Sequence, residues 1–403
     1  MRRDVLIADG LLLAIFAVLP VVGLAVGPGY AAMIFGLGGV RLLVSRGAGF
    51  SLDPVLTVLA VLFALWCWAS VSWSVMPAST VSGALQSTAV MAGALVFLGA
   101  SRTVSPRIAA LLPPVMTAAF VLGALVIAAD AVVGYASHGR YGLEAGTKFN
   151  RGVLYSMLLA GPVLAWWAER RDWRKVTVVV AALVVTIMVS VCTTAQLALP
   201  IAVAVLLVAY WRSGLTGKVL AAATTAMALS LPWLLRGIET YRSVLIPHIK
   251  PSAGARLEIW DFMSARVLDR PFLGWGLQVS HGIPATPSEL AHYVYITKAG
   301  IYPHNQWLEL WVDLGPVAVL LAIALIWVAY RRIGRLSAPF RPYALMVFVI
   351  VLVISSVDFQ VNTDSWWAAL AAQAFLFRIL DKSRVGVSDS LSASRNAVES
   401  VQV

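Results

Sequence analysis

Long runs of apolar residues, without the apolar–polar alternation of half-buried strands, most constrain how this chain can fold. A run of roughly 20 residues crosses a bilayer core about 30 Å thick as an α-helix. Hydrophobic residues make up 60% of the 403 positions and charged residues only 12%, a balance that a water-soluble fold of this length does not tolerate. Because lipid offers no partner to backbone amides, the sequence predicts an all-α, polytopic integral membrane protein.

The apolar runs predict about twelve transmembrane helices, with a range of roughly ten to twelve on length. The clear spans are residues 11–26, 55–71, 81–99, 108–133, 219–235 and 307–330. Shorter segments that need tilt to cross are residues 30–43, 153–167, 343–357 and 366–377. The run 176–210 is too long for one crossing, so we expect a break near Thr193, Thr194 and Pro200.

Basic residues set the predicted orientation, because short loops rich in Lys and Arg stay in the cytoplasm. Such residues recur in alternate connections and near the N-terminus, which predicts that both termini are cytoplasmic. The chain then divides into residues 1–235 with nine helices, a large periplasmic loop at 236–303, three helices within 304–384 and a disordered cytoplasmic tail at 385–403.

Two segments on the exported side are long and basic, residues 138–150 and 236–303, and they carry the candidate chemistry. Within the larger segment, residues 255–270 are predicted to be helical, with Arg256, Trp260 and Arg270 on one stripe and Glu258 and Asp261 off it. A basic and apolar face of this kind suits an anionic head group or a diphosphate. A solvated loop, or an amphipathic helix resting on the bilayer, accounts equally well for the charge pattern alone.

Several short motifs resemble one known family when they are taken in order. Residues Arg256, Trp260, Pro271, Gly274 and Gly276 are followed by His304, Asn305, Leu308 and Glu309 and then by Asp313, Leu314 and Gly315. Together with Asn150 and Arg151 at the start of a span, this string resembles the signature region of the O-antigen ligase and O-antigen polymerase superfamily. The chain departs from that family at Cys192–Ala195, where a Ser-Arg pair is common, so a phosphate contact there is not expected.

The resemblance implies an enzyme, a membrane glycosyltransferase of the O-antigen ligase type in the bacterial inner membrane. Its implied donor is a glycan linked to undecaprenyl diphosphate, and its implied acceptor is a sugar hydroxyl of lipid A-core on the periplasmic side. Because the donor is already activated, we expect no cofactor and no metal, and membrane lipids rather than nucleic acid as further partners.

Residue types suggest roles within that chemistry. Arg256 and Arg151 are the predicted diphosphate ligands, because a guanidinium binds phosphate oxygens bidentately, and His304 is the predicted base. The predicted substrate-binding residues are Asn305, Lys148, Asn150, Arg270 and Trp260. Glu309 and Asp313, about one turn apart within a span, are expected to pair with a cation or to shape the cavity.

Other functions stay open at this stage. A polymerase of the same superfamily transfers to another glycan repeat, and the motifs do not separate it from a ligase. A transporter or lipid flippase is also polytopic and basic, but tends to place charges near the bilayer midplane, whereas here they gather at the exported ends of spans. An oligosaccharyltransferase needs acidic metal ligands in a sizeable first exported loop, and residues 27–29 are too short for that.

Overall fold

A computed structural model describes residues 3–399 apart from 26, 48, 103, 135–146, 242–243, 245–250, 294–295 and 297–301. Side chains are not described at residues 3–5, 25, 27–28, 239–240, 251–252 and 384–399 either. The described residues form helices joined by short connections and contain no strand, which confirms the all-α prediction for this part of the chain.

The first half of the chain forms helices α1 (Arg3–Ala25), α2 (Gly27–Val44), α3 (Pro54–Ala69), α4 (Pro77–Ala100), α5 (Pro106–Val132), α7 (Asn150–Glu169), α8 (Trp173–Val189) and α9 (Thr193–Arg236). The second half forms α11 (Pro251–Asp269), α12 (Pro287–His292), α13 (Gln306–Ile333), α14 (Arg341–Val357) and α15 (Asp364–Glu399). Short 3-10 turns include Thr147–Phe149, directly before α7.

Six helical segments in the described chain are long and apolar enough to cross a membrane, which makes this a membrane protein by length and composition. Two further apolar helices, Gly29–Val44 and Arg341–Val357, are shorter. All twelve predicted apolar segments coincide with helices, but the count of twelve crossings stays a prediction. The disordered tail predicted at 385–403 lies outside the residues whose side chains are described, and it also stays a prediction.

The long run 176–210 breaks where the sequence predicts. Helix α8 ends at Val189, and α9 starts at Thr193 after a turn at 190–192. Helix α9 bends again at Arg212, whose φ of −142° and ψ of 58° lie outside the helical region. Its two halves therefore correspond to two of the predicted spans.

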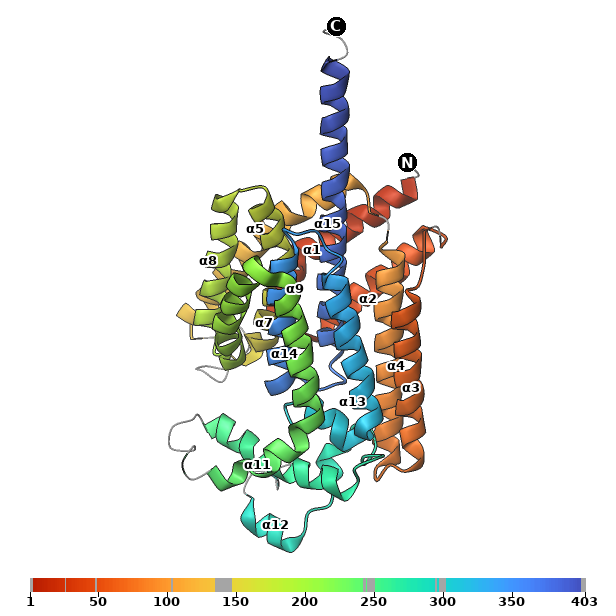
Figure 1. Cartoon of the computed structure of the whole chain (residues 1–403), viewed down its shortest axis with the longest axis vertical. Helices are drawn as coiled ribbons and strands as arrows, with labels where there is room; N and C mark the ends of the chain where they lie inside the picture. Colours follow the sequence, from red (N-terminus) through yellow and green to blue (C-terminus); the bar gives the residue numbers. More distant parts are fainter. Residues whose placement is uncertain are drawn as a thin grey trace.

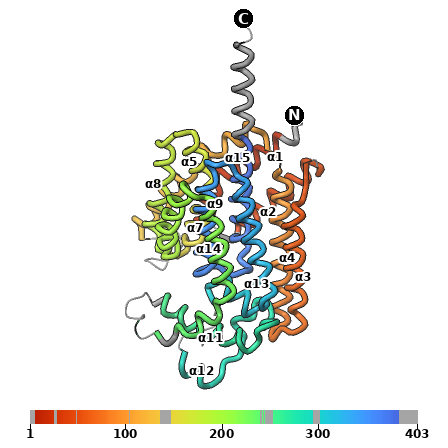
Figure 2. Tube along the Cα trace, viewed as in Figure 1, coloured from red at the N-terminus to blue at the C-terminus, as the bar shows by residue number. Residues whose placement is uncertain are grey.

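The helices pack into a bundle with α11 and α12 gathered at one end (Figure 1). Helix α1 starts and α15 finishes at the opposite end, so the two ends of the described chain lie on the same side of the bundle. Figure 2 shows α9 running beside α14 and α13 running beside α3, which matches their residue contacts. Helices α7, α9 and α13 therefore all begin at or near the α11 end.

A kink in α13 joins this helix to the connection that follows α11. Gly315 has a φ of +68°, and the following residue, Pro316, has no N–H to donate to the carbonyl of Val312. The amide of Trp275 takes that place and donates to Val312 O at 2.8 Å, and the amide of Gly276 donates to Asp313 O at 2.9 Å. The connection after α11, which contains Gly274 and Gly276, thus packs directly against the backbone of α13.

Candidate functional site

His304 lies in the connection directly before α13, held in an unusual backbone conformation. Its φ of +50° is in the left-handed region, which is uncommon for residues other than glycine. Its Nδ1 lies 3.3 Å from the carbonyl oxygen of Asp358, at the end of α14. A carbonyl can only accept a hydrogen bond, so Nδ1 is the donor and the neutral ring keeps its lone pair on Nε2.

The surroundings of His304 favour the neutral imidazole. Burial and then the positive charge of Arg256 lower the pKa of His304 from its ordinary 6.5, against a smaller opposing effect of Asp358. A neutral ring with a lone pair on Nε2 has the form that a general base requires. His304 therefore has the tautomer and the protonation state that a general base requires, and its role as the base stays a prediction.

Helix α11 carries Arg256 and Trp260 to the same place. The charge of Arg256 acts on His304 and also on Cys192, which immediately precedes α9. One turn further along α11, the indole Nε1 of Trp260 donates to Pro303 O at 2.6 Å. Trp260 thus ties α11 to the backbone next to His304, so the structure gives it a positioning contact besides any contact with substrate.

The start of α7 meets the start of α9 beside these residues. The thiol of Cys192 donates to Asn150 O at 3.8 Å, and the charge of Asp358 acts on both Cys192 and His304. The side-chain Oδ1 of Asn150 is buried without a hydrogen-bond partner among the described residues, so it can accept one from a ligand. The structure therefore brings Asn150, Arg256 and His304 into one neighbourhood.

Arg151 and Lys148 flank this neighbourhood and are both exposed. Tyr155, one turn along α7, interacts electrostatically with both Arg151 and Asp358. Lys148 lies in the 3-10 turn before α7. The predicted exported loop 138–150 otherwise falls on residues 138–146, which lie outside the described residues.

Asn305 caps α13. Its Oδ1 accepts hydrogen bonds from the amides of Trp307 and Leu308, both at 3.1 Å. The side chain is buried, so its observed role is to start the helix rather than to face a ligand. Helices α7, α9 and α13 thus present their N-termini near His304, and the partial positive charge of helix N-termini favours an anion.

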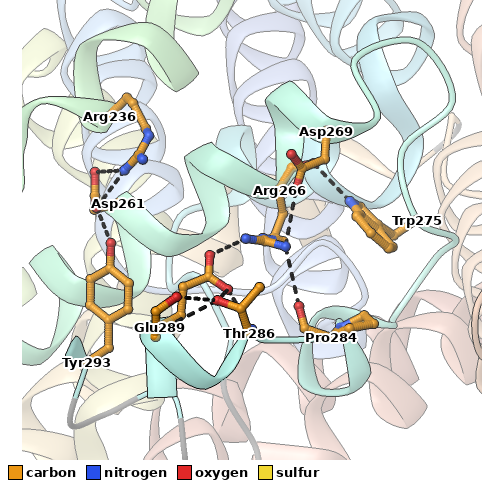
Figure 3. Close-up of polar contacts among 10 residues, drawn as sticks. Arg236, Asp261, Arg266, Asp269, Trp275, Pro284, Thr286, Glu289 and Tyr293 are labelled. Carbon is orange, nitrogen blue, oxygen red and sulfur yellow. Dashed lines mark hydrogen bonds and ion pairs between the residues drawn. The ribbon is translucent and has the colours of Figure 1, made fainter. Parts of the chain in front are cut away.

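Two other arginines of the loop region are neutralised by carboxylates (Figure 3). Arg236 donates to both oxygens of Asp261, at 2.9 and 2.8 Å, and the Tyr293 hydroxyl donates to the same carboxylate. Arg266 pairs with Glu289 and, at 3.1 Å, with Asp269. Arg256, in contrast, forms no ion pair with any residue that the structure describes, so its guanidinium can bind an anionic ligand.

The same network corrects the predicted face of α11. The sequence placed Glu258 and Asp261 off the stripe that was to face the membrane or the protein, yet both are buried, at 0% and 2% exposure. Asp261 is turned inward because Arg236 and Tyr293 reach it there. The face of α11 that packs on the protein is therefore acidic as well as apolar.

Arg270 is not brought to the His304 neighbourhood. It is exposed, and its guanidinium stacks 4.1 Å from the ring centroid of Trp275. It directly follows α11, about 20 Å along the helix axis from Arg256 at about 1.5 Å per residue. Its observed contact anchors the connection that follows α11.

Glu309 and Asp313 were expected to pair with a cation or to shape the cavity, and their observed contacts are with backbone amides. Glu309 Oε2 accepts from the amide of Val361, and Asp313 Oδ2 accepts from the amide of Gln278, both at 2.8 Å. No described cation forms an ion pair with either residue. The two carboxylates hold the connections that flank the site.

The most important contact that sequence reasoning missed is the carbonyl of Asp358. No sequence signal identifies it, because every residue carries a carbonyl and only the packing of α14 selects this one. In the described part of the chain, no group of three His, Cys, Asp or Glu side chains is arranged to hold a metal ion. The arrangement consists of a guanidinium without an ion-pair partner among the described residues and a neutral imidazole on which its charge acts, near the N-termini of three helices.

Part of the chain is similar in sequence to known proteins. The family model of the O-antigen ligase matches residues 178–323, which include Arg256, His304 and the kink at Gly315. Similar segments occur in proteins named as proposed polysaccharide ligases from Rickettsia conorii (28% identical), Rickettsia felis (27%) and Rickettsia typhi (26%). Each alignment covers 121 residues, 29% of this chain and 29% to 30% of the relative. The family match over residues 178–323 and these relatives support the resemblance seen in the sequence: this part of the chain is similar to the O-antigen ligase family.

Proposed function

We propose that this protein is an O-antigen ligase. It transfers a glycan from undecaprenyl diphosphate to a sugar hydroxyl of lipid A-core, at the periplasmic face of the bacterial inner membrane and without a metal. The observation that carries the proposal is a neutral His304, its lone pair on Nε2, close enough to feel the charge of Arg256, which forms no ion pair with a described residue.

The reaction needs two things that this pairing supplies. The leaving diphosphate gains negative charge as the bond to the sugar breaks, and a guanidinium stabilises that charge through two parallel hydrogen bonds. The attacking hydroxyl must lose its proton, and an imidazole whose pKa lies below 6.5 is ready to accept it at neutral pH. Arg151 and Lys148 are proposed to extend the cationic surface for the diphosphate, and Asn150 to orient a hydroxyl.

The bonds that change are balanced. The hydroxyl oxygen of the acceptor bonds to the anomeric carbon of the donor, the bond from that carbon to the diphosphate breaks, and its electron pair leaves with the diphosphate. The hydroxyl proton passes to Nε2 of His304 and is later released to water. The activated donor supplies the driving force, so no nucleotide is required.

The test is complementation of a deletion strain, read on a lipopolysaccharide gel. Wild-type protein should restore long O-antigen bands, whereas His304→Asn should not. Asparagine tolerates the left-handed conformation at this position, so the variant removes the imidazole without straining the backbone. Full complementation by a normally expressed His304→Asn variant would refute the assignment of the base.

The gel of the deletion strain also tests the polymerase alternative. A ligase defect leaves polymerised glycan on the carrier lipid, with bare core on the gel. A polymerase defect instead leaves core carrying a single repeat, and that pattern would replace the ligase assignment with polymerisation.

A further inference from the structure

The connection between α14 and α15, residues 358–363, is held by side chains from the first turn of α13 and by His304, two residues before that helix. His304 Nδ1 binds Asp358 O at 3.3 Å, Gln306 Nε2 donates to Gln360 O at 3.1 Å, and Glu309 Oε2 accepts from Val361 N at 2.8 Å. We call these three contacts the α13 clamp. The clamp links the imidazole to a carboxylate more than one helical turn away.

Glu309 is the costly member of the clamp. Its side chain is buried at 3% exposure within an apolar helix, where a carboxylate is expensive to place. Its observed partner is the backbone amide of Val361 rather than a cation. A need to hold residues 358–361 in place at the site accounts for this unfavourable burial of a carboxyl group.

The position of that segment decides the state of His304. The Asp358 carbonyl selects the tautomer with the proton on Nδ1, because a carbonyl cannot donate. If the carbonyl of Asp358 moves away from Nδ1, it no longer selects this tautomer. The ring proton can then occupy Nε2, and Nε2 no longer has the lone pair with which to accept a proton.

We propose that Glu309 is a positioning residue that fixes the tautomer of His304, by holding the amide of Val361 and thereby the carbonyl of Asp358. The assignment of Nε2 as the proton acceptor rests on the proposed function, whereas the tautomer itself does not. Glu309 acts through backbone geometry, so its reach matters more than its charge.

Three substitutions separate reach from charge. Glu309→Gln keeps an oxygen at the same distance and loses the charge, Glu309→Asp keeps the charge and withdraws the oxygen, and Glu309→Leu removes both. Positioning by reach predicts that the Gln variant resembles wild type while the Asp and Leu variants do not. A role for the charge predicts the reverse order for Gln and Asp.

The tautomer is measured by nitrogen-15 NMR of histidine-labelled full-length protein in detergent, with His304→Asn identifying the signal among five histidines. Wild type and Glu309→Gln should show the proton on Nδ1. Glu309→Asp and Glu309→Leu should show a mixture, and should lower kcat about 10- to 100-fold with KM for the donor within about threefold. If the Leu variant does not fold, the Asp variant carries the test.

Asp313→Asn is the matched control. Asp313 is an equally buried carboxylate one turn along α13, but it holds the amide of Gln278 in a different connection. Its substitution should leave the His304 tautomer unchanged. An unchanged tautomer in Glu309→Asp, or a Gln variant as impaired as Leu, would overturn the positioning role. Because the NMR measurement needs no substrate, it is separate from the proposed function, which fails instead if His304→Asn stays active.

Discussion

Replacing Gly274 with alanine tests whether the signature glycines hold α13 to the connection after α11. Gly274 has a φ of +69°, and a Cβ built there lies 2.6 Å from Val312 O and from the carbonyl carbon and oxygen of Asp313. All three atoms are backbone, so no side chain can rotate away. The alanine must push the connection off the helix.

The cost follows from the contacts that are lost. Left-handed backbone costs an alanine about 1 to 2 kcal/mol, and the bonds from Trp275 N and Gly276 N contribute about 1 kcal/mol each. We therefore expect Gly274→Ala to lower stability by about 3 kcal/mol, measured as a fall of several degrees in the thermal unfolding midpoint of purified protein in detergent.

The matched control is Gly39→Ala on α2, a helical glycine with no atom within 4 Å of a built Cβ. Alanine is a better helix former by up to about 1 kcal/mol, so this variant should unfold at the wild-type temperature or slightly above it. A Gly274→Ala variant as stable as the Gly39→Ala variant would show that the close approach at the kink is not what holds the two segments together.

Four further outcomes are expected. In purified protein, Arg256→Lys should lower the rate of glycan transfer at least about tenfold, because lysine cannot form the two parallel hydrogen bonds of a guanidinium. Arg270→Lys, beyond the far end of α11, should change that rate little. Equal losses in both variants would refute the different roles given to the two arginines. The kcat/KM should decline as pH falls through the pKa of His304, so the acid-limb midpoint should lie below 6.5, and a midpoint above 6.5 would contradict the effects of burial and Arg256. EDTA should leave transfer intact, and a loss restored by a divalent metal would show the metal-free mechanism to be wrong. Finally, Ser288→Cys should react with a membrane-impermeant thiol reagent applied from the periplasmic side. The background should be low because both native cysteines are buried. Labelling only from the cytoplasm would show that the predicted topology is the wrong way round.

The secondary structure was predictable because apolar length alone dictates helices in lipid. The break between α8 and α9 falls where the run 176–210 exceeds one bilayer crossing, and the helix at 255–270 ends at Asp269, before Pro271. The bend at Arg212 was not predicted as such. The backbone dihedral angles of Arg212 are not helical, and this residue lies between two segments that were predicted to be separate spans.

The candidate site was predictable in its residue types and less so in its partners. The guanidinium and the imidazole were identified by their chemistry and order, and the structure brings Arg256 and His304 together. It also shows that Asn305 and Trp260 are held in positioning contacts, and that Arg270 is stacked on Trp275. A sequence shows which side chains can bind an anion, but charge pairing such as Arg236 with Asp261 decides which of them are free to do so.

The glycines of the signature illustrate the same division between chemistry and packing. In the sequence, Gly274, Gly276 and Gly315 belong to the motifs that carry the family resemblance. In the structure they let two backbones approach, because a Cβ at Gly276 would collide with Ser74 and one at Gly315 with the carbonyl of Phe272. The kink then supplies carbonyls for Trp275 and Gly276, and the part of α13 before the kink carries Glu309 and the clamp on residues 358–361. The signature therefore joins residues that we propose to act on substrate to residues that fix where those side chains stand, and only the second group can be tested without a substrate.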